Sequence, residues 1–176
     1  MQRQPDAGSG GERWSILVLG VLVACGGPTL RGGVYVDDEA SYRVGQLGPE
    51  WTPIDLAQND LAWRNPSNGS IVQVNATCDP FQDVPLTSLT NHLLIGFTAR
   101  DRRGSSLISL DGREALRSHI RASLDGVPRE LLFYVLKKDE CTYDFALIAP
   151  PGPAFESSAP VFDRFVREFS TEGARR

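Results

Sequence analysis

The chain has 176 residues, of which 41% are hydrophobic and 23% are charged, and its formal net charge is −4. This composition is typical of a globular protein and excludes a largely disordered chain, and the length predicts one domain with additional segments. The negative charge gives no electrostatic support for nucleic-acid binding, so we expect no nucleic-acid partner.

The N-terminus has the pattern of a bacterial export signal. Residues 14–24 form an apolar run. As a helix this run would rise only about 16 Å, too short for a bilayer core of roughly 30 Å, but it has the length of the apolar part of a signal peptide. Residues 22–25 read LVAC, which resembles the bacterial lipobox, in which a small residue precedes the lipid-accepting cysteine. The resemblance implies that residues 1–24 are a lipoprotein signal peptide and that Cys25 is acylated with a fatty acid such as palmitate.

Two other interpretations of this segment stay open. It is also compatible with a secretory signal that carries no lipid, or with a buried apolar helix and an incidental cysteine. Signal peptides normally carry positive charge before the apolar run. Asp6 and Glu12 leave this stretch without net positive charge, which indicates that the true start codon lies nearer Arg13. If Cys25 carries lipid, the protein is anchored to a membrane of the cell envelope and faces the periplasm or the cell exterior; stable anchoring takes two or more acyl chains.

Residues 26–40 are rich in glycine and acidic residues, which is typical of a flexible linker. We therefore expect a tether over residues 25–40 and a single α+β domain over residues 41–176. The acidic residues 37–39 lack the alternating ligands of a calcium-binding loop.

Cys78 and Cys141 are the two cysteines that remain after Cys25. Each lies at the end of an alternating apolar run, and an even pair in an oxidising compartment predicts a disulfide. A bridge between them would close the loop of residues 78–141, which in the chain-entropy model contributes about 4 kcal/mol to the free energy of unfolding. Two buried free thiols stay open as an alternative. Two cysteines without a nearby histidine make a poor zinc site, so we expect no metal and no cofactor.

The first half of the domain predicts short strands and then a helix. Residues 51–54 and 60–64 are candidate strands, and a turn cluster at residues 66–69 leads into residues 70–77, which alternate as in a half-buried strand. Five apolar residues then share one face at helical spacing. They are Leu86, Leu89, Leu93, Leu94 and Phe97.

A meander of strands follows. We expect strands over residues 106–110, 113–124, 129–137 and 141–148, with Asp111-Gly112 and Asp125-Gly126 as hairpin turns. The third of these strands is apolar on both faces, which indicates a central strand covered on both sides. The second has one apolar face, and Arg117, His119 and Arg121 share the other. The charged residues 101–104 are interpreted as a solvated loop.

The C-terminal part predicts a second helix. Prolines over residues 150–153 break the strand pattern, and Ser157 or Ser158 is the expected N-cap, with Pro160 in the first turn. Phe162, Phe165, Val166 and Phe169 form an apolar stripe that must pack on the sheet. The order of elements gives an α+β fold in which an antiparallel β-sheet is flanked by helices, an α/β/α sandwich.

This order resembles the PsbP-like fold, which is shared with the Ran-release-factor family and several bacterial lipoprotein families. Residues 110–115, LDGREA, are similar to the hairpin that such domains place after their first long helix. The resemblance covers residues 42–169 and carries no catalytic residues to transfer. It implies a non-enzymatic binding or accessory role, by analogy of fold.

Motifs of catalysis and cofactor binding are absent from the sequence. It contains no Gly-x-Ser-x-Gly, phosphate loop, dinucleotide fingerprint, His-Glu-x-x-His or Cys-x-x-Cys. We therefore expect a non-enzymatic, membrane-tethered module that binds an envelope protein or an apolar ligand. The sheet edge and a groove between sheet and helix are the expected binding places.

Two sets of residues stay open as candidate sites. Arg117, His119 and Arg121 form a candidate surface for an anion or an acidic partner, although a solvent-exposed strand face explains the same pattern. The alternative function is an envelope hydrolase with an unrecognised active site. Its residues would have to come from His92, His119, Asp101 and Asp144. A purely structural lipoprotein is the third possibility.

Overall fold

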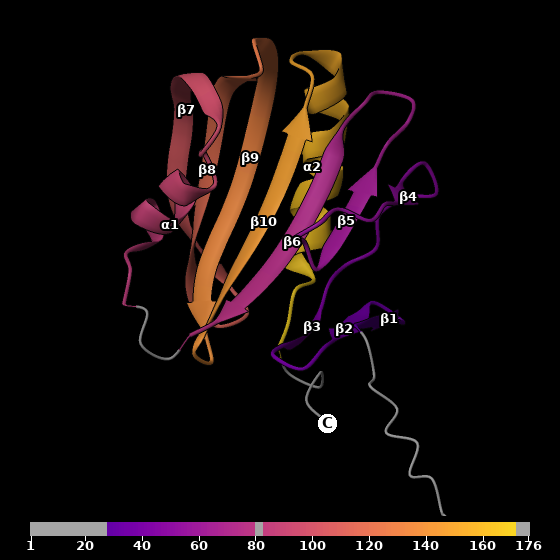
Figure 1. Ribbon diagram of the computed structural model, residues 1–176, viewed down its shortest axis with the longest axis vertical. Helices are drawn as coiled ribbons and strands as arrows, with labels where there is room; N and C mark the ends of the chain where they lie inside the picture. Colours follow the sequence, from indigo (N-terminus) through magenta and orange to yellow (C-terminus); the bar gives the residue numbers. More distant parts are fainter. Residues whose placement is uncertain (1–27, 80–82, 172–176) are drawn as a thin grey trace, which may run out of the picture.

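The computed structural model describes residues 28–79 and 83–171, which form two antiparallel sheets and two helices (Figure 1). The smaller sheet contains β1 (Thr29–Arg31), β2 (Val34–Val36) and β3 (Ser41–Arg43), in that order. The larger sheet has the order β4-β5-β6-β10-β9-β8-β7. Its strands are β4 (Thr52–Pro53), β5 (Leu61–Arg64), β6 (Ile71–Cys78), β7 (Phe97–Leu110), β8 (Arg113–Leu124), β9 (Val127–Lys138) and β10 (Cys141–Ala149). The helices are α1 (Leu86–His92) and α2 (Pro153–Arg167).

The two helices cover opposite faces of the larger sheet. α2 packs against β9 and β10, whereas α1 packs against β8 and β9 on the other face (Figure 1). β9 is buried on both sides, because Tyr134 and Leu136 belong to the core under α2 while Leu131 and Phe133 belong to the core under α1. The predicted α/β/α sandwich and the doubly covered central strand are confirmed.

Both predicted hairpin turns are present. Asp111 and Gly112 have φ of 48° and 72°, and Asp125 and Gly126 have φ of 51° and 78°. Positive φ at both central residues is the geometry of a type I′ turn, which favours Asp-Gly. These turns fix the antiparallel register of β7, β8 and β9.

α2 begins earlier than predicted. Its apolar stripe is buried as expected, with Phe162, Phe165 and Val166 at most 1% exposed. The helix begins at Pro153, however, because Gly152 reverses the chain at φ 81° and proline suits the first helical position. Pro160 consequently lies inside the helix. Ser158 is not the N-cap: its buried hydroxyl donates to the Ser70 hydroxyl at 3.0 Å.

α1 and β7 also depart from the prediction. The helix ends at His92, and Gly96 at φ 89° turns the chain so that Phe97 begins a strand. The charged residues 101–104 therefore lie in β7 and do not form a loop. Pairing with the long strand β8 outweighs their polar composition, and register shifts at 98–101 and 102–104 accommodate them at this exposed edge.

The flexible tether expected over residues 25–40 is wrong for the part that the structure describes. β1 and β2 lie within it, joined by Gly32 and Gly33, and Tyr35 is buried against Tyr42 with ring centroids 5.0 Å apart. Burial of these aromatic side chains outweighs the glycine-rich composition. Cys25 and the signal peptide predicted over residues 1–24 lie outside the described residues.

The smaller sheet is joined to the end of α2. The backbone amides of Arg43 and Ser170 bond to each other's carbonyl oxygens at 2.8 and 3.2 Å. A Cβ at Gly45 would lie only 2.7 Å from the carbonyl oxygen of Phe165, so this close approach requires glycine.

Among the helices of residues 28–79 and 83–171, none is long and apolar enough to cross a membrane.

Candidate functional site

A disulfide joins two neighbouring strands at one end of the larger sheet. Cys78, the last residue of β6, and Cys141, the first of β10, are register partners, and their sulfur atoms are bonded at 2.02 Å. The Asp79 amide also donates to the Glu140 carbonyl at 3.1 Å. The predicted disulfide is confirmed, and it fixes β6 to the turn between β9 and β10.

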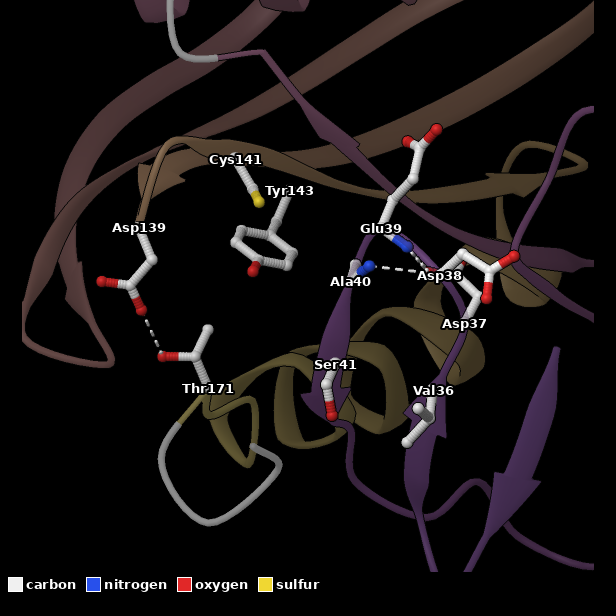
Figure 2. Close-up of a pocket in the computed structure, with 10 residues that line it drawn as sticks. All are labelled: Val36, Asp37, Asp38, Glu39, Ala40, Ser41, Asp139, Cys141, Tyr143 and Thr171. Carbon is white, nitrogen blue, oxygen red and sulfur yellow. Dashed lines mark hydrogen bonds between the residues drawn. The ribbon is translucent and has the colours of Figure 1, made fainter. Parts of the chain in front are cut away.

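An acidic cavity of about 340 Å³, here called the acidic pocket, opens beside this disulfide (Figure 2). It is lined by Val36, Asp37, Asp38, Glu39, Ala40, Ser41, Asp139, Cys141, Tyr143 and Thr171. These lining residues bring four carboxyl groups and no lysine, arginine or histidine. Residues 36–41 form one wall, and Asp139 with Thr171 lies across from them (Figure 2).

The carboxyl groups of the first wall have different roles. Asp37 closes the turn between β2 and β3: its Oδ1 accepts from the amides of Glu39 and Ala40 at 2.8 and 2.6 Å, and its Oδ2 accepts from the Tyr35 hydroxyl at 2.8 Å. Burial, followed by the bond to Asp37, raises the pKa of Tyr35 well above its usual value. Asp38 and Glu39 are exposed, so their charges are available to a partner.

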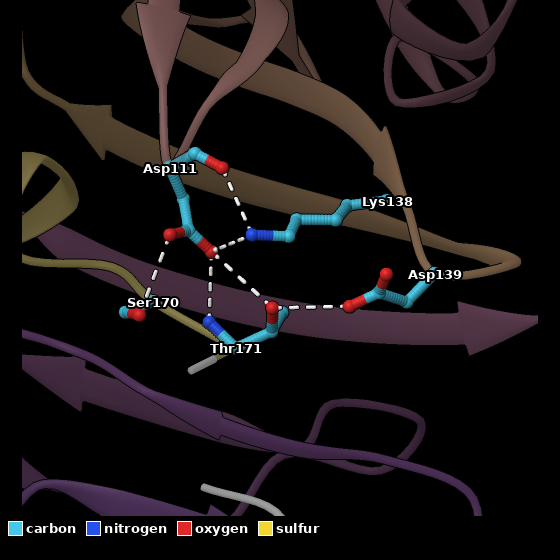
Figure 3. Close-up of polar contacts among 5 residues, drawn as sticks. All are labelled: Asp111, Lys138, Asp139, Ser170 and Thr171. Atoms are coloured by element: carbon cyan, nitrogen blue, oxygen red, sulfur yellow. Dashed lines mark hydrogen bonds and ion pairs between the residues drawn. The ribbon is translucent and has the colours of Figure 1, made fainter. Parts of the chain in front are cut away.

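A polar cluster holds the opposite wall in place (Figure 3). Lys138 Nζ lies 2.7 Å from Asp111 Oδ2, and both side chains are nearly buried. The same oxygen accepts from the Thr171 amide at 2.8 Å, and the Thr171 hydroxyl donates to Asp139 at 3.1 Å. Although burial opposes ionisation of Asp111, the bonds from Lys138 and Thr171 lower its pKa. The cluster therefore joins the β7–β8 and β9–β10 turns to the segment after α2. Asp111 neutralises the charge of Lys138.

A second cavity of about 340 Å³ is lined by the β9–β10 turn and its neighbours. Its lining mixes both signs of charge: Asp79, Arg113, Lys137, Lys138, Asp139, Glu140, Cys141 and Thr142. Asp139 and Cys141 line both cavities. The disulfide therefore stabilises the wall between an acidic and a mixed-charge cavity.

The predicted row on β8 lies under α2. Arg117 pairs with Asp163 of α2 at 3.2 Å and donates to the Tyr134 hydroxyl at 2.9 Å. Burial raises the pKa of Tyr134 to about 12.

The other two members of the row share one carboxylate. His119 Nε2 and Arg121 Nε lie 2.7 and 3.4 Å from Glu130 Oε1, and the His119 ring stacks on Phe155 at a centroid distance of 4.8 Å. The row thus packs α2 against the sheet and is neutralised by carboxylates of the same chain. An anion-binding role for Arg117, His119 and Arg121 stays a prediction.

The four residues considered for a hydrolase do not come together. His119 lies under α2, whereas Asp144 lies on the opposite face of the sheet, where Asn75 donates to it at 3.1 Å. Asp101 is exposed on edge strand β7 and pairs with Arg103, and His92 ends α1. Within residues 28–79 and 83–171, no group of three His, Cys, Asp or Glu side chains is placed to hold a metal ion.

Asp144 is nevertheless an unusual carboxyl group. Burial raises its pKa to about 6 against the opposing bond from Asn75, and Asp60 adds to the rise. Asp60 itself accepts from the Tyr42 hydroxyl and the Ala76 amide at 3.0 and 2.8 Å. These contacts join β3, β6 and β10 through polar groups.

The sequence matches no protein-family model and no curated protein. Solved structures do share its arrangement. LpqN of Mycobacterium tuberculosis, described as involved in cell envelope biogenesis, superposes with a TM-score of 0.52 and 12% identity over 81% of this chain and 88% of LpqN. CyanoP, the cyanobacterial PsbP of Synechocystis sp. PCC 6803, gives 0.51 and 15% over 85% of this chain and 98% of CyanoP. The chain has the PsbP-like fold.

A point mutant of Mog1 extends this likeness to a Ran-release-factor-like protein. Its TM-score is 0.51 at 10% identity, over 80% of this chain and 91% of Mog1. At such identities the PsbP-like fold is shared, while residues and activities are not transferred. The predicted resemblance is confirmed for the fold.

The acidic pocket has no local signal in the sequence that predicts it. Most of its first wall falls in the segment predicted to be a tether. That segment nevertheless contains a hairpin signal, because Gly32-Gly33 separates residues 29–31 from the β-prone residues 34–36. Its second wall comes from residues more than 90 positions later, and no local pattern reports that contact.

Proposed function

We propose that this protein is a lipid-anchored module of the cell envelope that binds a positively charged segment of another envelope protein in the acidic pocket and catalyses no reaction. The observation that carries the binding proposal is the acidic pocket itself, with four carboxyl groups and no cationic side chain in its lining. The lipobox-like sequence at residues 22–25 supports the anchor.

The disulfide supports an oxidising compartment, since such bonds are rare in the bacterial cytosol. It also stabilises one wall of the acidic pocket, and a rigid wall reduces the entropy lost when a partner binds. Asp139 and the turn around Asp37 are both held by hydrogen bonds, so the pocket is preformed. LpqN, with the same fold, is described as involved in cell envelope biogenesis, which is compatible with an accessory role.

The test measures binding of a fluorescein-labelled hexalysine peptide to the full-length protein in detergent at low salt. Asp38→Asn/Glu39→Gln removes two exposed charges from the pocket but leaves the turn-forming Asp37 in place. We expect the peptide to bind about fivefold to tenfold more weakly, since each exposed ion pair between a carboxylate and a lysine contributes up to about 1 kcal/mol to the free energy of binding. Binding should also weaken as salt screens the charges.

Asp55→Asn/Glu50→Gln is the matched control, because both side chains are exposed and lie outside the acidic pocket. It makes the same change in net charge and should bind the peptide nearly as well as the unchanged protein. Equal losses in the two double variants would mean that only net charge attracts the peptide, and the proposal would fail.

A further inference from the structure

An apolar groove separates the smaller sheet from the edge of the larger one. Its volume is about 230 Å³, and its lining consists of Leu30, Gly33, Val44, Gly45, Gln46, Leu47, Trp51, Pro53 and Trp63. None of these nine residues is charged, and Gln46 has the one polar side chain apart from the indole N–H groups. The groove thus contrasts with the acidic pocket and the mixed-charge cavity.

The groove is a continuation of the main core to the surface. Val44, Trp51 and Trp63 belong to the core under α2, and Trp63 packs edge-on against Phe165 with ring centroids 5.4 Å apart. At the outer end Leu30 is 42% exposed on β1. A wall that runs from core tryptophan to exposed leucine offers an apolar occupant contact with apolar side chains, but it offers a charged one no side chain of opposite charge.

One residue that lines the groove lies close in sequence to Cys25, and this indicates which occupant can reach the groove. Leu30 is five residues after Cys25, and five residues span at most about 18 Å when fully extended. The described chain begins at Pro28, next to β1, so it enters the fold beside the groove. A lipid attached to Cys25 would therefore lie within about 18 Å of Leu30, because no long linker separates the two residues.

We infer that this groove holds one acyl chain of the lipid on Cys25. The inference rests on the proposed lipid anchor and assigns that lipid a second contact besides the bilayer. An acyl chain has the chemistry that the lining accepts, since it is apolar and carries no charge. Occupation of the groove would hold the folded domain close to its anchor.

Photochemical cross-linking tests the inference directly. The full chain is produced in cells supplied with a fatty acid that carries a diazirine, and intact mass first establishes whether Cys25 bears lipid. After illumination, we expect peptides containing Leu30, Leu47 or Trp51 to carry the cross-linked acyl chain. Leu30→Glu places a charge at the exposed end of the groove and should reduce these cross-links at least tenfold.

Leu107→Glu is the matched control, because Leu107 is 57% exposed on β7 and lies outside the groove. It should leave the cross-links unchanged. If Cys25 carries lipid but cross-links form only with bilayer lipid, detergent or a second copy, the inference is overturned while the anchor stands. If Cys25 carries no lipid, the proposed anchor and this inference fail together, and the mass alone identifies that case.

Discussion

Ionisation of the Asp144 carboxyl group opposes folding. Burial holds its pKa near 6, above the value of 3.8 expected for an unfolded chain. A raised carboxyl pKa means that the folded state prefers the neutral acid. The contribution of Asp144 to stability is therefore fully present below about pH 4 and is lost as the pH rises through 6.

We predict that Asp144→Asn raises the free energy of unfolding by about 2 kcal/mol at pH 7.5 and changes it little at pH 4. Asparagine keeps an oxygen that accepts from Asn75 but removes the buried charge. Urea titrations of both proteins at the two pH values measure the difference. Asp55→Asn, at an exposed position, should have no such effect, and a gain for Asp144→Asn that is equal at both pH values would contradict the assignment.

Asp111 is the opposite case, a nearly buried carboxylate that folding requires in its charged form. It pairs with Lys138 and accepts the Thr171 amide, and these bonds keep its pKa low despite burial. Its contribution to stability is present above its unfolded pKa and is lost as the pH falls through the lower folded value.

Asp111→Asn should lower the free energy of unfolding by about 3 kcal/mol, because Lys138 is left nearly buried without a countercharge. Asparagine suits the positive φ of the turn, so the loss reports the ion pair and not the backbone. Adding Lys138→Met should recover much of the loss. Additive losses in the double variant, measured by denaturant unfolding, would show that the two side chains do not act as a pair.

At the scale of elements, the β9–β10 turn is strained. Asp139 and Glu140 have φ of 53° and 64°, a conformation that glycine adopts without steric cost. Asp139 lines both cavities beside the disulfide and Glu140 lines the mixed-charge one, and strain at such places is often retained for function.

Glu140→Gly should therefore raise the free energy of unfolding by roughly 1 kcal/mol, through relief of this strain. Thermal unfolding monitored by circular dichroism measures the effect. Glu114→Gly, in regular strand β8, is the control and should destabilise the protein. A loss of stability in Glu140→Gly would show that the turn gains more from its side chain than it loses to strain.

The disulfide between β6 and β10 closes a loop with a sequence separation of 63. Cys78→Ala/Cys141→Ala should lower the free energy of unfolding by about 4 kcal/mol, mainly because the unfolded chain is no longer constrained. A reductant should produce the same loss in the unchanged protein and none in the double variant. If reduction destabilised both proteins equally, the effect would not come from this bond.

Local patterns predicted the elements that local interactions determine. The Asp-Gly turns, the doubly apolar strand β9 and the Phe162–Phe165 stripe of α2 each depend on neighbours in sequence, and the structure contains them all. β7 was predicted too short because its charged half is a strand only through pairing with β8. The place of the row at Arg117 under α2 was missed for the same reason, since Asp163 lies 46 residues away.

At the scale of the whole molecule, the smaller sheet and the segment after α2 meet beside the disulfide. β3 bonds to Ser170 after α2, and the cluster around Asp111 joins that segment to two hairpin turns (Figure 3). Both the acidic pocket and the apolar groove are lined in part by residues 30–45, in and next to the smaller sheet, and these residues follow the proposed lipid site closely in the sequence. The proposed anchor and the proposed occupant of the apolar groove both require that the chain be exported and lipidated at Cys25.

Intact-mass spectrometry of the protein extracted from its native membrane tests that requirement most directly. The account predicts a chain that begins at Cys25, carries a diacylglyceryl group on that sulfur, and lacks two hydrogens because Cys78 and Cys141 are joined. A cytosolic chain of unmodified mass that retains residues 1–24 and has free thiols would contradict it.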